Sequence, residues 1–404
     1  MSKTYLIIGG GQAGAQAVDT LRREGFDGRL VLAGEECELP YQRPPLSKKY
    51  LSGEMAEDRL PFRQRAFYDD HRVELLLGAR AVRLDPGARR VWFADGTGMN
   101  YDRALLCLGA TARRLDCAGA GLEGVHYLRN LRDASSLRAE LRAGARAVII
   151  GGGYIGLEIA ATCRRLGLEA TVLEMTGRIL NRVVAPAVSE FFTRAHRERG
   201  VQVVCNTRVV ALEGGTRVER VKCADGAGFE ADLVIVGVGA LPATELAASA
   251  SLPLDNGIIV DEHCRSADPS IFAAGDCTNH PSLRYGTRVR LESVDNAFEQ
   301  AKTAALNMLD RNAVHDRVPW FWSDQYEHKL LIVGLSAAHD ECVIRADPLG
   351  AGFSVLYFKN SELIALEAVD DSKDYMAARK LIAGRNRLDP RKAQDWSRDL
   401  KDAL

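Results

Sequence analysis

The chain has 404 residues, which at ~150 residues per domain corresponds to between two and three domains that can each bury a core. Hydrophobic residues make up 47% and charged residues 26%, which excludes a disordered, collagen-like or coiled-coil chain. Lys and Arg (53) balance Asp and Glu (54), and the net charge of −1 gives no overall attraction to nucleic acid. We therefore expect a multidomain globular protein that does not bind nucleic acid.

The N-terminus leads directly into the apolar residues 5–8, without a separate signal-peptide core or cleavage site. No uninterrupted apolar run reaches the length of about 18 residues that a membrane span needs. The longest candidate, residues 147–161, is broken by three adjacent glycines. We expect a soluble, cytoplasmic protein with no membrane partner.

The first predicted unit is a strand, a glycine-rich turn, a helix and a second strand. Residues 5–8 lead into GGGQAG at residues 9–14, residues 15–23 have helical character, and residues 30–33 form the next strand. In a G-x-G-x-x-G motif the first glycine permits a tight turn, the second lets the backbone approach a pyrophosphate, and the third lets helix and strand pack closely. Glu35, 21 residues beyond the last glycine, is placed to accept hydrogen bonds from an adenosine ribose.

The same unit recurs about 140 residues later. Residues 147–150 lead into GGGYIG at residues 151–156, and the following helix and strand end at Glu174, 18 residues beyond the last glycine. One such motif is a weak signal, but two copies with the same context indicate two dinucleotide sites. Because hydride must pass between two dinucleotides, we expect a bound flavin in the first copy and a diffusible nicotinamide in the second.

The acid in the second copy also bears on which nicotinamide binds. The Glu174 carboxylate would repel a 2′-phosphate, which favours NADH over NADPH. Arg178 lies nearby in the sequence and can pair with such a phosphate, which leaves NADPH open.

Three further apolar segments are predicted strands that return to a sheet. Residues 104–108 end at Gly109, residues 232–236 end at a glycine-rich turn, and residues 270–276 end in Asp276. Ligands of such sheets cross the carboxyl ends of the strands. For the third segment, a simple turn is the alternative interpretation.

The nine cysteines form neither a C-x-x-C pair nor a zinc-binding spacing, so we expect reduced, mostly buried thiols and no metal site. They are Cys37, Cys107, Cys117, Cys163, Cys205, Cys223, Cys264, Cys277 and Cys342.

Several strings of the sequence are more specific than the glycine motifs. They include YQRPPLSK at 41–48, GGGYIGLE at 151–158, AGDC at 274–277, RLESVDNA at 290–297 and PWFWSDQY at 319–326. Together with the first glycine motif, they resemble the flavin-dependent ferredoxin reductases of the putidaredoxin-reductase and biphenyl-dioxygenase-reductase type.

This resemblance implies an α/β, glutathione-reductase-like fold with two Rossmann-type dinucleotide-binding domains and a C-terminal α+β domain. It divides the chain into an FAD-binding domain of two segments, 1–110 and 242–320, an NAD-binding domain at 111–241, and a C-terminal domain at 321–404. Where the family commonly has Ala-Thr-Gly, this chain has Cys107-Leu108-Gly109.

The resemblance also implies the cofactor contacts, position by position. The expected FAD contacts are Gly9, Gly11, Ala13, Gly14, Glu35, Arg43, Lys48, Ala81, Gly109, Arg129, Asp276, Val294 and Trp322, the last beside the isoalloxazine ring. The expected NAD contacts are Gly151, Gly153, Ile155, Gly156, Glu174 and Gly239.

Our hypothesis for the mechanism is hydride transfer from NADH to flavin N5, followed by delivery of single electrons to a [2Fe–2S] ferredoxin. That ferredoxin would supply an oxygenase, either a haem monooxygenase or a Rieske dioxygenase. We expect Lys48 and Glu158 to lie beside N5 as a buried pair and Glu292 to contact the nicotinamide. A cation in a low-dielectric site stabilises negative charge on the reduced cofactor.

The missing cysteine pair supports this hypothesis, because disulfide reductases of this fold pass electrons through two neighbouring cysteines. The enzyme alternatives are an NADH oxidase or a rubredoxin reductase. An alternative of another class is a redox-sensing interaction protein in which the flavin stabilises a binding form. Since ferredoxins are usually acidic, we expect a basic docking face, with candidates Arg65, Arg288, Arg290, Lys302, Arg311, Lys329 and the basic C-terminal tail.

Overall fold

The computed structural model describes residues 3–346, 350 and 352–404. The described chain forms two compact units, each built from separate segments. Unit 1 consists of Met1–Gln42, Asp58–Thr111 and Leu241–Pro319, and unit 2 of Arg43–Glu57, Ala112–Ala240 and Trp320–Leu404. Two of the points at which the chain passes from one unit to the other fall in β8 (Ala110–Ala112) and β17 (Ala240–Pro242).

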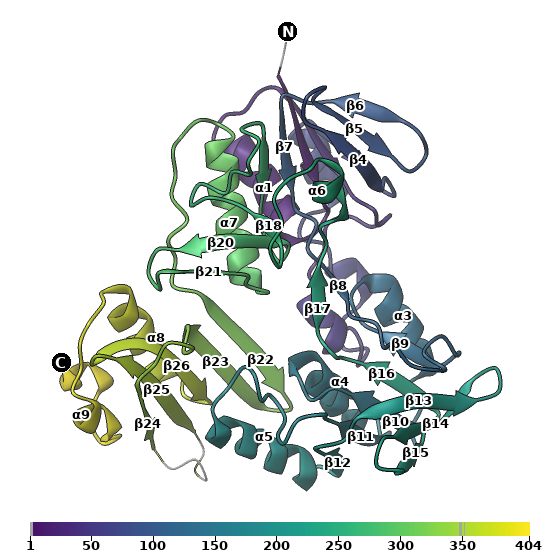
Figure 1. Cartoon of the computed structure of the whole chain (residues 1–404), viewed down its shortest axis with the longest axis vertical. Helices are drawn as coiled ribbons and strands as arrows, with labels where there is room; N and C mark the ends of the chain where they lie inside the picture. The colour runs from purple at the N-terminus through teal and green to yellow at the C-terminus, as the bar shows by residue number, and fades with distance from the viewer. Residues whose placement is uncertain (1–2, 347–349, 351) are drawn as a thin grey trace. The chain divides into compact units, whose positions relative to one another are not determined.

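Unit 1 is built on a parallel five-stranded sheet with the order β19-β7-β1-β2-β3 (Figure 1). Its strands are β1 (Thr4–Ile8), β2 (Arg29–Ala33), β3 (Val73–Leu76), β7 (Arg103–Leu106) and β19 (Ile271–Ala273). Two three-stranded sheets join it: β4 (Ala81–Asp85), β5 (Arg90–Phe93) and β6 (Gly98–Asn100), and β18 (Ile258–Ile259), β20 (Thr278–Ser282) and β21 (Thr287–Val289). Its helices include α1 (Gln12–Arg23), α2 (Arg65–Asp70), α6 (Glu245–Ser249) and α7 (Val294–Asn307).

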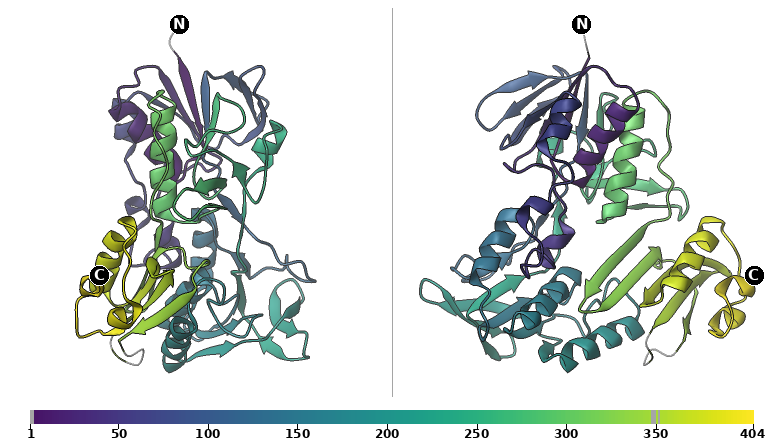
Figure 2. Two further views of the ribbon diagram at one scale, coloured as in Figure 1. Left: turned by 60° about the vertical axis from the view of Figure 1, so that its left-hand side comes forward. Right: turned by 180° about the vertical axis from the view of Figure 1, so that it is seen from behind.

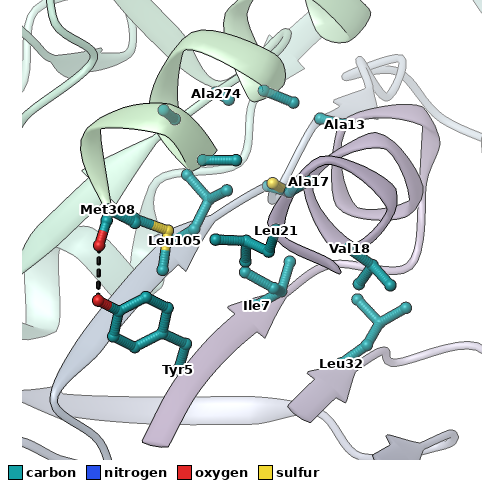
Figure 3. Packing of buried hydrophobic residues seen from close by; sticks show 14 of the residues in the cluster. Tyr5, Ile7, Ala13, Ala17, Val18, Leu21, Leu32, Leu105, Ala274 and Met308 are labelled. Atoms are coloured by element: carbon teal, nitrogen blue, oxygen red, sulfur yellow. Dashed lines mark hydrogen bonds between the residues drawn. The ribbon is translucent and has the colours of Figure 1, made fainter. Parts of the chain in front are cut away.

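Helices α1 and α7 lie side by side against this parallel sheet (Figure 2). Small buried residues on α1, Ala13 and Ala17, allow the two helices to approach closely (Figure 3). The Tyr5 hydroxyl on β1 donates a hydrogen bond of 2.6 Å to the carbonyl of Met308, just beyond α7. The core therefore ties segments about 300 residues apart in sequence into one domain.

Unit 2 contains a second parallel sheet with the order β12-β11-β10-β16-β9. Its strands are β9 (Val125–Tyr127), β10 (Arg146–Ile150), β11 (Glu169–Leu173), β12 (Val201–Val204) and β16 (Leu233–Val236). An antiparallel sheet follows, formed by β13 (Val209–Gly214), β14 (Val218–Cys223) and β15 (Gly228–Glu230). The helices of this part are α3 (Leu131–Glu140), α4 (Tyr154–Arg165) and α5 (Pro186–Glu198).

The C-terminal part of unit 2 is an antiparallel five-stranded sheet with the order β22-β23-β26-β25-β24. Its strands are β22 (Trp320–Gln325), β23 (His328–Gly334), β24 (Glu341–Arg345), β25 (Phe353–Lys359) and β26 (Glu362–Val369). Helix α8 (Ser372–Ala383) packs on this sheet, followed by α9 (Pro390–Gln394) and η3 (Leu400–Ala403) (Figure 1).

The short segment Arg43–Glu57 clusters with unit 2, although the neighbouring residues on both sides belong to unit 1. It contains η1 (Pro44–Ser47), and η2 (Glu57–Arg59) begins at its end. Helix η1 packs on α4, because Thr162 Oγ1 on α4 donates a hydrogen bond of 3.0 Å to the carbonyl of Ser47. The assignment of the four sequence segments to FAD, NAD and C-terminal domains stays a prediction.

Candidate functional site

The first glycine motif joins β1 to α1 and leaves an open cradle at the helix N-terminus. Gly9 has φ +120°, and a Cβ there would lie 2.1 Å from the carbonyl oxygen of Cys107. A Cβ on Gly14 would lie 2.0 Å from the carbonyl oxygen of Gly9. By contrast, a Cβ on Gly11, the N-cap of α1, would meet nothing within 4 Å, and no side chain caps this helix end. Two glycines therefore serve close packing, and the third faces space that a pyrophosphate fits.

The second glycine motif repeats this geometry between β10 and α4. Gly151 has φ +107°, and its Cβ would lie 2.3 Å from the carbonyl oxygen of Gly237. A Cβ on Gly156 would lie 2.2 Å from the carbonyl oxygen of Gly151. Gly153, the N-cap of α4, again has open space around its missing Cβ and no side-chain cap. Each unit thus holds one dinucleotide cradle at the carboxyl end of a parallel sheet.

The two acids beyond these motifs lie in different surroundings. The Glu35 side chain is 68% exposed, and its Oε1 lies 3.8 Å from Arg80 Nε. Glu174 Oε2 accepts a hydrogen bond of 2.8 Å from the Gly152 backbone, and Oε1 accepts from the backbone and hydroxyl of Thr176. Glu174 therefore also fixes the shape of the glycine loop, a role that the sequence pattern does not reveal.

Asp276 follows β19 at a point where two helices begin. Gly275 has φ +88°, and its Cβ would lie 3.5 Å from Ala13 on α1 and 3.7 Å from Ala297 on α7. Val294 is the first residue of α7, and the Ser293 hydroxyl caps that helix. Gly9, Gly11, Ala13, Gly14, Asp276 and Val294 therefore all lie within unit 1, and their contacts to FAD stay a prediction.

Lys48 and Glu158, which the sequence places 110 residues apart, form an ion pair within unit 2. Lys48 Nζ lies 2.8 Å from Glu158 Oε2, and the Glu158 side chain is only 5% exposed. The Ser47 hydroxyl donates to Glu158 Oε2 over 2.6 Å, and the Ser323 hydroxyl donates to Oε1 over 2.7 Å. Both carboxylate oxygens are thus bonded, which satisfies a charge buried on α4.

Ser47 and Ser323 belong to this site together with Lys48 and Glu158, but the sequence pattern did not indicate a role for the two serines. Ser47 lies in the YQRPPLSK string and Ser323 in the PWFWSDQY string, both used only for the resemblance. Their place in these two specific strings is the sequence signal that could have pointed to the two serines. Which carboxylate the hydroxyls would reach depends on how η1 and β22 pack against α4.

The other expected cofactor residues are distributed over both units. In unit 2, Arg43 donates to the carbonyl of Arg129 over 2.8 Å, and Trp322 on β22 stacks on Trp320 with ring centroids 5.4 Å apart. Ile155 on α4 is exposed, and Gly239 has φ +108°.

In unit 1, Ala81 begins β4, Gly109 has φ +67°, and Glu292 forms an ion pair with Arg290. Their contacts to FAD and NAD stay predictions.

The basic residues expected to dock a ferredoxin include some that have partners within their own unit. Arg290 is paired with Glu292, and Arg288 donates to Asn279 Oδ1 over 2.9 Å and to the carbonyl of Val260 over 2.8 Å. Arg65 pairs with Asp69 over 3.3 Å. The docking face therefore stays a prediction.

All nine cysteines lie in the described part of the chain and are free thiols. Cys107, Cys264 and Cys277 belong to the buried cores of unit 1. Burial raises the pKa of Cys277 to about 11 and also raises the pKa of Cys107 and of Cys264 well above the ordinary thiol value, so these thiols are protonated at neutral pH. Within residues 3–346, 350 and 352–404, no group of metal-ligating side chains and no helix able to span a membrane is found.

Two glycine cradles at two parallel sheets, each followed by an acid after the next strand and without a paired disulfide, define an oxidoreductase that uses FAD and a nicotinamide dinucleotide. Comparison with known sequences agrees with this class. The family model described as pyridine nucleotide-disulphide oxidoreductase matches residues 3–301, and the model described as reductase C-terminal matches residues 320–404. The chain belongs to the pyridine nucleotide-disulphide oxidoreductase family.

Individual relatives match over nearly the whole chain. The 5,5'-dehydrodivanillate O-demethylase ferredoxin reductase subunit of Sphingobium sp. is 41% identical over 98% of this chain and 97% of its own length. A rubredoxin-NAD(+) reductase of Pseudomonas putida is 37% identical over 90% of this chain and 95% of its own. The reductase in the covalent putidaredoxin reductase-putidaredoxin complex is 38% identical, with a TM-score of 0.96 over 99% of this chain and 98% of that chain. These matches confirm the α/β, glutathione-reductase-like fold and the resemblance.

Proposed function

We propose that this protein is an NADH-dependent ferredoxin reductase that delivers single electrons to a [2Fe–2S] ferredoxin serving an oxygenase. The overall reaction is NADH plus two oxidised ferredoxins to NAD⁺, a proton and two reduced ferredoxins. The observation that carries the proposal is that both dinucleotide cradles are intact while all nine cysteines are free. Such a chain has no disulfide through which to pass an electron pair.

The names of the relatives also support electron transfer from NADH to a ferredoxin. One is a ferredoxin reductase subunit of an O-demethylase, and the matching crystal structure is a complex of a reductase with putidaredoxin. When bound, FAD accepts two electrons together and releases them one at a time. A cytoplasmic location is also part of the proposal.

The residues of the protein position the two cofactors and supply charged groups beside the flavin. The proposed FAD cradle is formed by Gly9, Gly11 and Gly14, with Glu35 at the ribose and Asp276 at the helix N-termini of unit 1. The proposed NAD cradle is formed by Gly151, Gly153 and Gly156, with Glu174 at the ribose. Lys48 and Glu158 are proposed to lie beside the reacting nitrogen of the flavin, where Lys48 stabilises negative charge.

Glu158 controls the position of Lys48 in this arrangement. Because the carboxylate is buried and accepts from two serines, it can hold the ammonium group at a fixed point. Glu292 is proposed to contact the nicotinamide, and its pairing with Arg290 would hold the carboxylate in place.

Steady-state oxidation of NADH with four acceptors tests the proposal: a [2Fe–2S] ferredoxin coupled to cytochrome c, a rubredoxin, oxygen and a small disulfide. We expect ferredoxin to raise the rate of cytochrome c reduction well above the rate with cytochrome c alone. A higher rate with rubredoxin or oxygen would favour a rubredoxin reductase or an NADH oxidase. An unchanged, slow rate with every acceptor would favour a redox-sensing interaction protein.

A further inference from the structure

A line of buried polar side chains connects Glu158 on α4 to Tyr326, the residue that follows β22. It runs from Ser323 and Gln325 on β22 to His196 on α5 and ends at Tyr326. Ser323, Gln325 and His196 are fully buried, with exposed fractions of 0%. Ser323 and Gln325 point to the same face of β22, because side chains alternate along a strand. The outer end, Tyr326, lines a cavity of about 530 Å³ together with Arg164 and Arg199.

Each hydrogen bond in this line has a defined direction. His196 Nε2 lies 2.9 Å from Gln325 Oε1, which can only accept, so Nε2 carries the proton. Nδ1 of the neutral ring is then an acceptor, and the Tyr326 hydroxyl donates to it over 3.1 Å. Gln325 Nε2 donates to Ser323 Oγ over 3.3 Å, and Ser323 donates its own hydrogen to Glu158 Oε1 over 2.7 Å. All four bonds point towards the carboxylate.

The protonation states of His196 and Tyr326 agree with these hydrogen-bond directions. Burial lowers the pKa of His196 to about 4, with the Arg199 guanidinium acting in the same direction, so the ring is neutral at physiological pH. Burial raises the pKa of Tyr326, so its hydroxyl keeps its proton and stays a donor. A protonated His196 would have no acceptor for the Tyr326 hydroxyl, so the hydrogen bond from Tyr326 to His196 would break.

The line holds the oxygen of Glu158 that the lysine does not contact. Ser47, the last residue of η1, and Lys48, which follows it, both approach Oε2, whereas Ser323 approaches Oε1 from β22. A carboxylate bonded from two different elements cannot rotate without breaking one of these contacts. Its orientation, and with it the position of the Lys48 ammonium group, is therefore fixed in part from the C-terminal sheet, through Ser323.

We propose that Ser323, Gln325 and His196 are positioning residues that orient Glu158 and thereby place the Lys48 ammonium group for flavin reduction. This inference rests on the proposed role of the Lys48–Glu158 pair beside the flavin and goes beyond it. It gives the C-terminal sheet a part in electron uptake from NADH. The hydrogen bonds of these three residues lead to the Glu158 carboxylate and not to Lys48, so each acts through the carboxylate.

A double-mutant cycle on the FAD-loaded, full-length protein tests this inference. The variants are Ser323→Ala, Lys48→Ala and the double variant, with the rate of flavin reduction measured by stopped flow over a range of NADH concentrations. We expect Ser323→Ala alone to lower the limiting rate by roughly three- to tenfold, the effect of one lost hydrogen bond, without weakening NADH binding. In the Lys48→Ala background the same substitution should have little further effect, because the group that it places is gone.

Two further variants separate positioning from general stability. Ser323→Thr keeps the hydroxyl and should restore most of the rate. The matched control is Ser354→Ala, because Ser354 is also fully buried in this sheet and donates to another carboxylate, Asp371, over 3.2 Å. It should lower the unfolding temperature without changing the limiting rate. If Ser323→Ala does not fold, His196→Asn tests the same line from its other end.

The midpoint potential of bound FAD provides a readout that does not depend on turnover. A looser Lys48 ammonium group stabilises negative charge less, so Ser323→Ala should shift the potential to a more negative value and Ser354→Ala should not. Equal effects of Ser323→Ala with and without Lys48 would overturn the positioning role and leave the proposed role of Lys48 intact. A wild-type rate in Lys48→Ala would overturn both.

Discussion

The ammonium group of Lys48 lies 2.8 Å from the carboxylate of Glu158, which is buried on α4 and also accepts hydrogen bonds from Ser47 and Ser323. This pair joins a short Pro-rich segment to the helix that begins at the second glycine motif. The chemistry proposed for the protein therefore depends on a contact between α4 and the segment Arg43–Glu57, both within unit 2.

Lys48→Ala tests whether this contact matters for flavin reduction. We expect the limiting rate of reduction by NADH to fall at least about tenfold, equivalent to about 1.4 kcal/mol of lost stabilisation, because the proposed site loses its cation. Lys49→Ala is the matched control, since Lys49 is the neighbouring exposed lysine and should leave the rate unchanged. A stopped-flow rate equal to wild type in Lys48→Ala would remove Lys48 from the mechanism.

Substituting alanine for Gly11 or Gly153, the glycine with open space in each motif, should show which motif binds FAD and which binds NADH. Gly11→Ala and Gly153→Ala each place a methyl group in empty space, so folding should be unaffected. Gly11→Ala should weaken FAD binding by about tenfold or more, about 1.4 kcal/mol, because the methyl group occupies the path of the pyrophosphate. Gly153→Ala should keep FAD and raise the KM for NADH. FAD content and KM measure these effects.

Gly121→Ala serves as the control for both glycine variants, because its Cβ also meets nothing within 4 Å and it lies outside either motif. Loss of FAD from Gly153→Ala, or a raised KM alone in Gly11→Ala, would contradict the assignment of the two cradles.

Removing the charge of Glu174 should change the choice of nicotinamide. Glu174→Gln keeps an oxygen that can accept from the Gly152 backbone but no longer repels a 2′-phosphate. We expect the ratio of kcat/KM for NADH over NADPH to fall at least about fivefold, about 1 kcal/mol. The wild-type enzyme should prefer NADH, and equal efficiencies with the two nucleotides would disprove the argument from Glu174.

Buried histidines should make the folded state sensitive to mild acid. Burial lowers the pKa of His196 and His315 to about 4 and that of His280 to about 3, each from an ordinary value of 6.5. Between pH 6.5 and about 4 the unfolded chain binds protons that the folded chain does not. The free energy of unfolding should therefore fall with falling pH, by up to about 1.4 kcal/mol per pH unit for each histidine.

Urea unfolding of wild type and His315→Gln at pH 7.5, 6 and 5 measures this effect. The variant lacks one titrating group, so its free energy of unfolding should decline less steeply between pH 6 and 5. Parallel curves for the two proteins would show that His315 does not remain neutral in the folded state.

The strand, glycine turn and helix units could be predicted from the sequence because their signals are local. The expected strands at 5–8 and 147–150 agree with β1 and β10 to within one residue. The contact of Ser323 with Glu158 could not be predicted in this way, since the two residues are 165 positions apart and meet only when β22 packs on α4. Likewise, nothing local in residues 43–57 indicates that they cluster with unit 2 rather than with their neighbours.

In the proposed reaction, the enzyme converts one NADH into two single-electron deliveries to a ferredoxin. An anaerobic titration measures this directly, with catalytic enzyme, excess [2Fe–2S] ferredoxin and known additions of NADH followed by absorbance. We predict two ferredoxins reduced per NADH consumed. No reduction of ferredoxin, with the enzyme-bound flavin itself reduced by NADH, would contradict the proposed function.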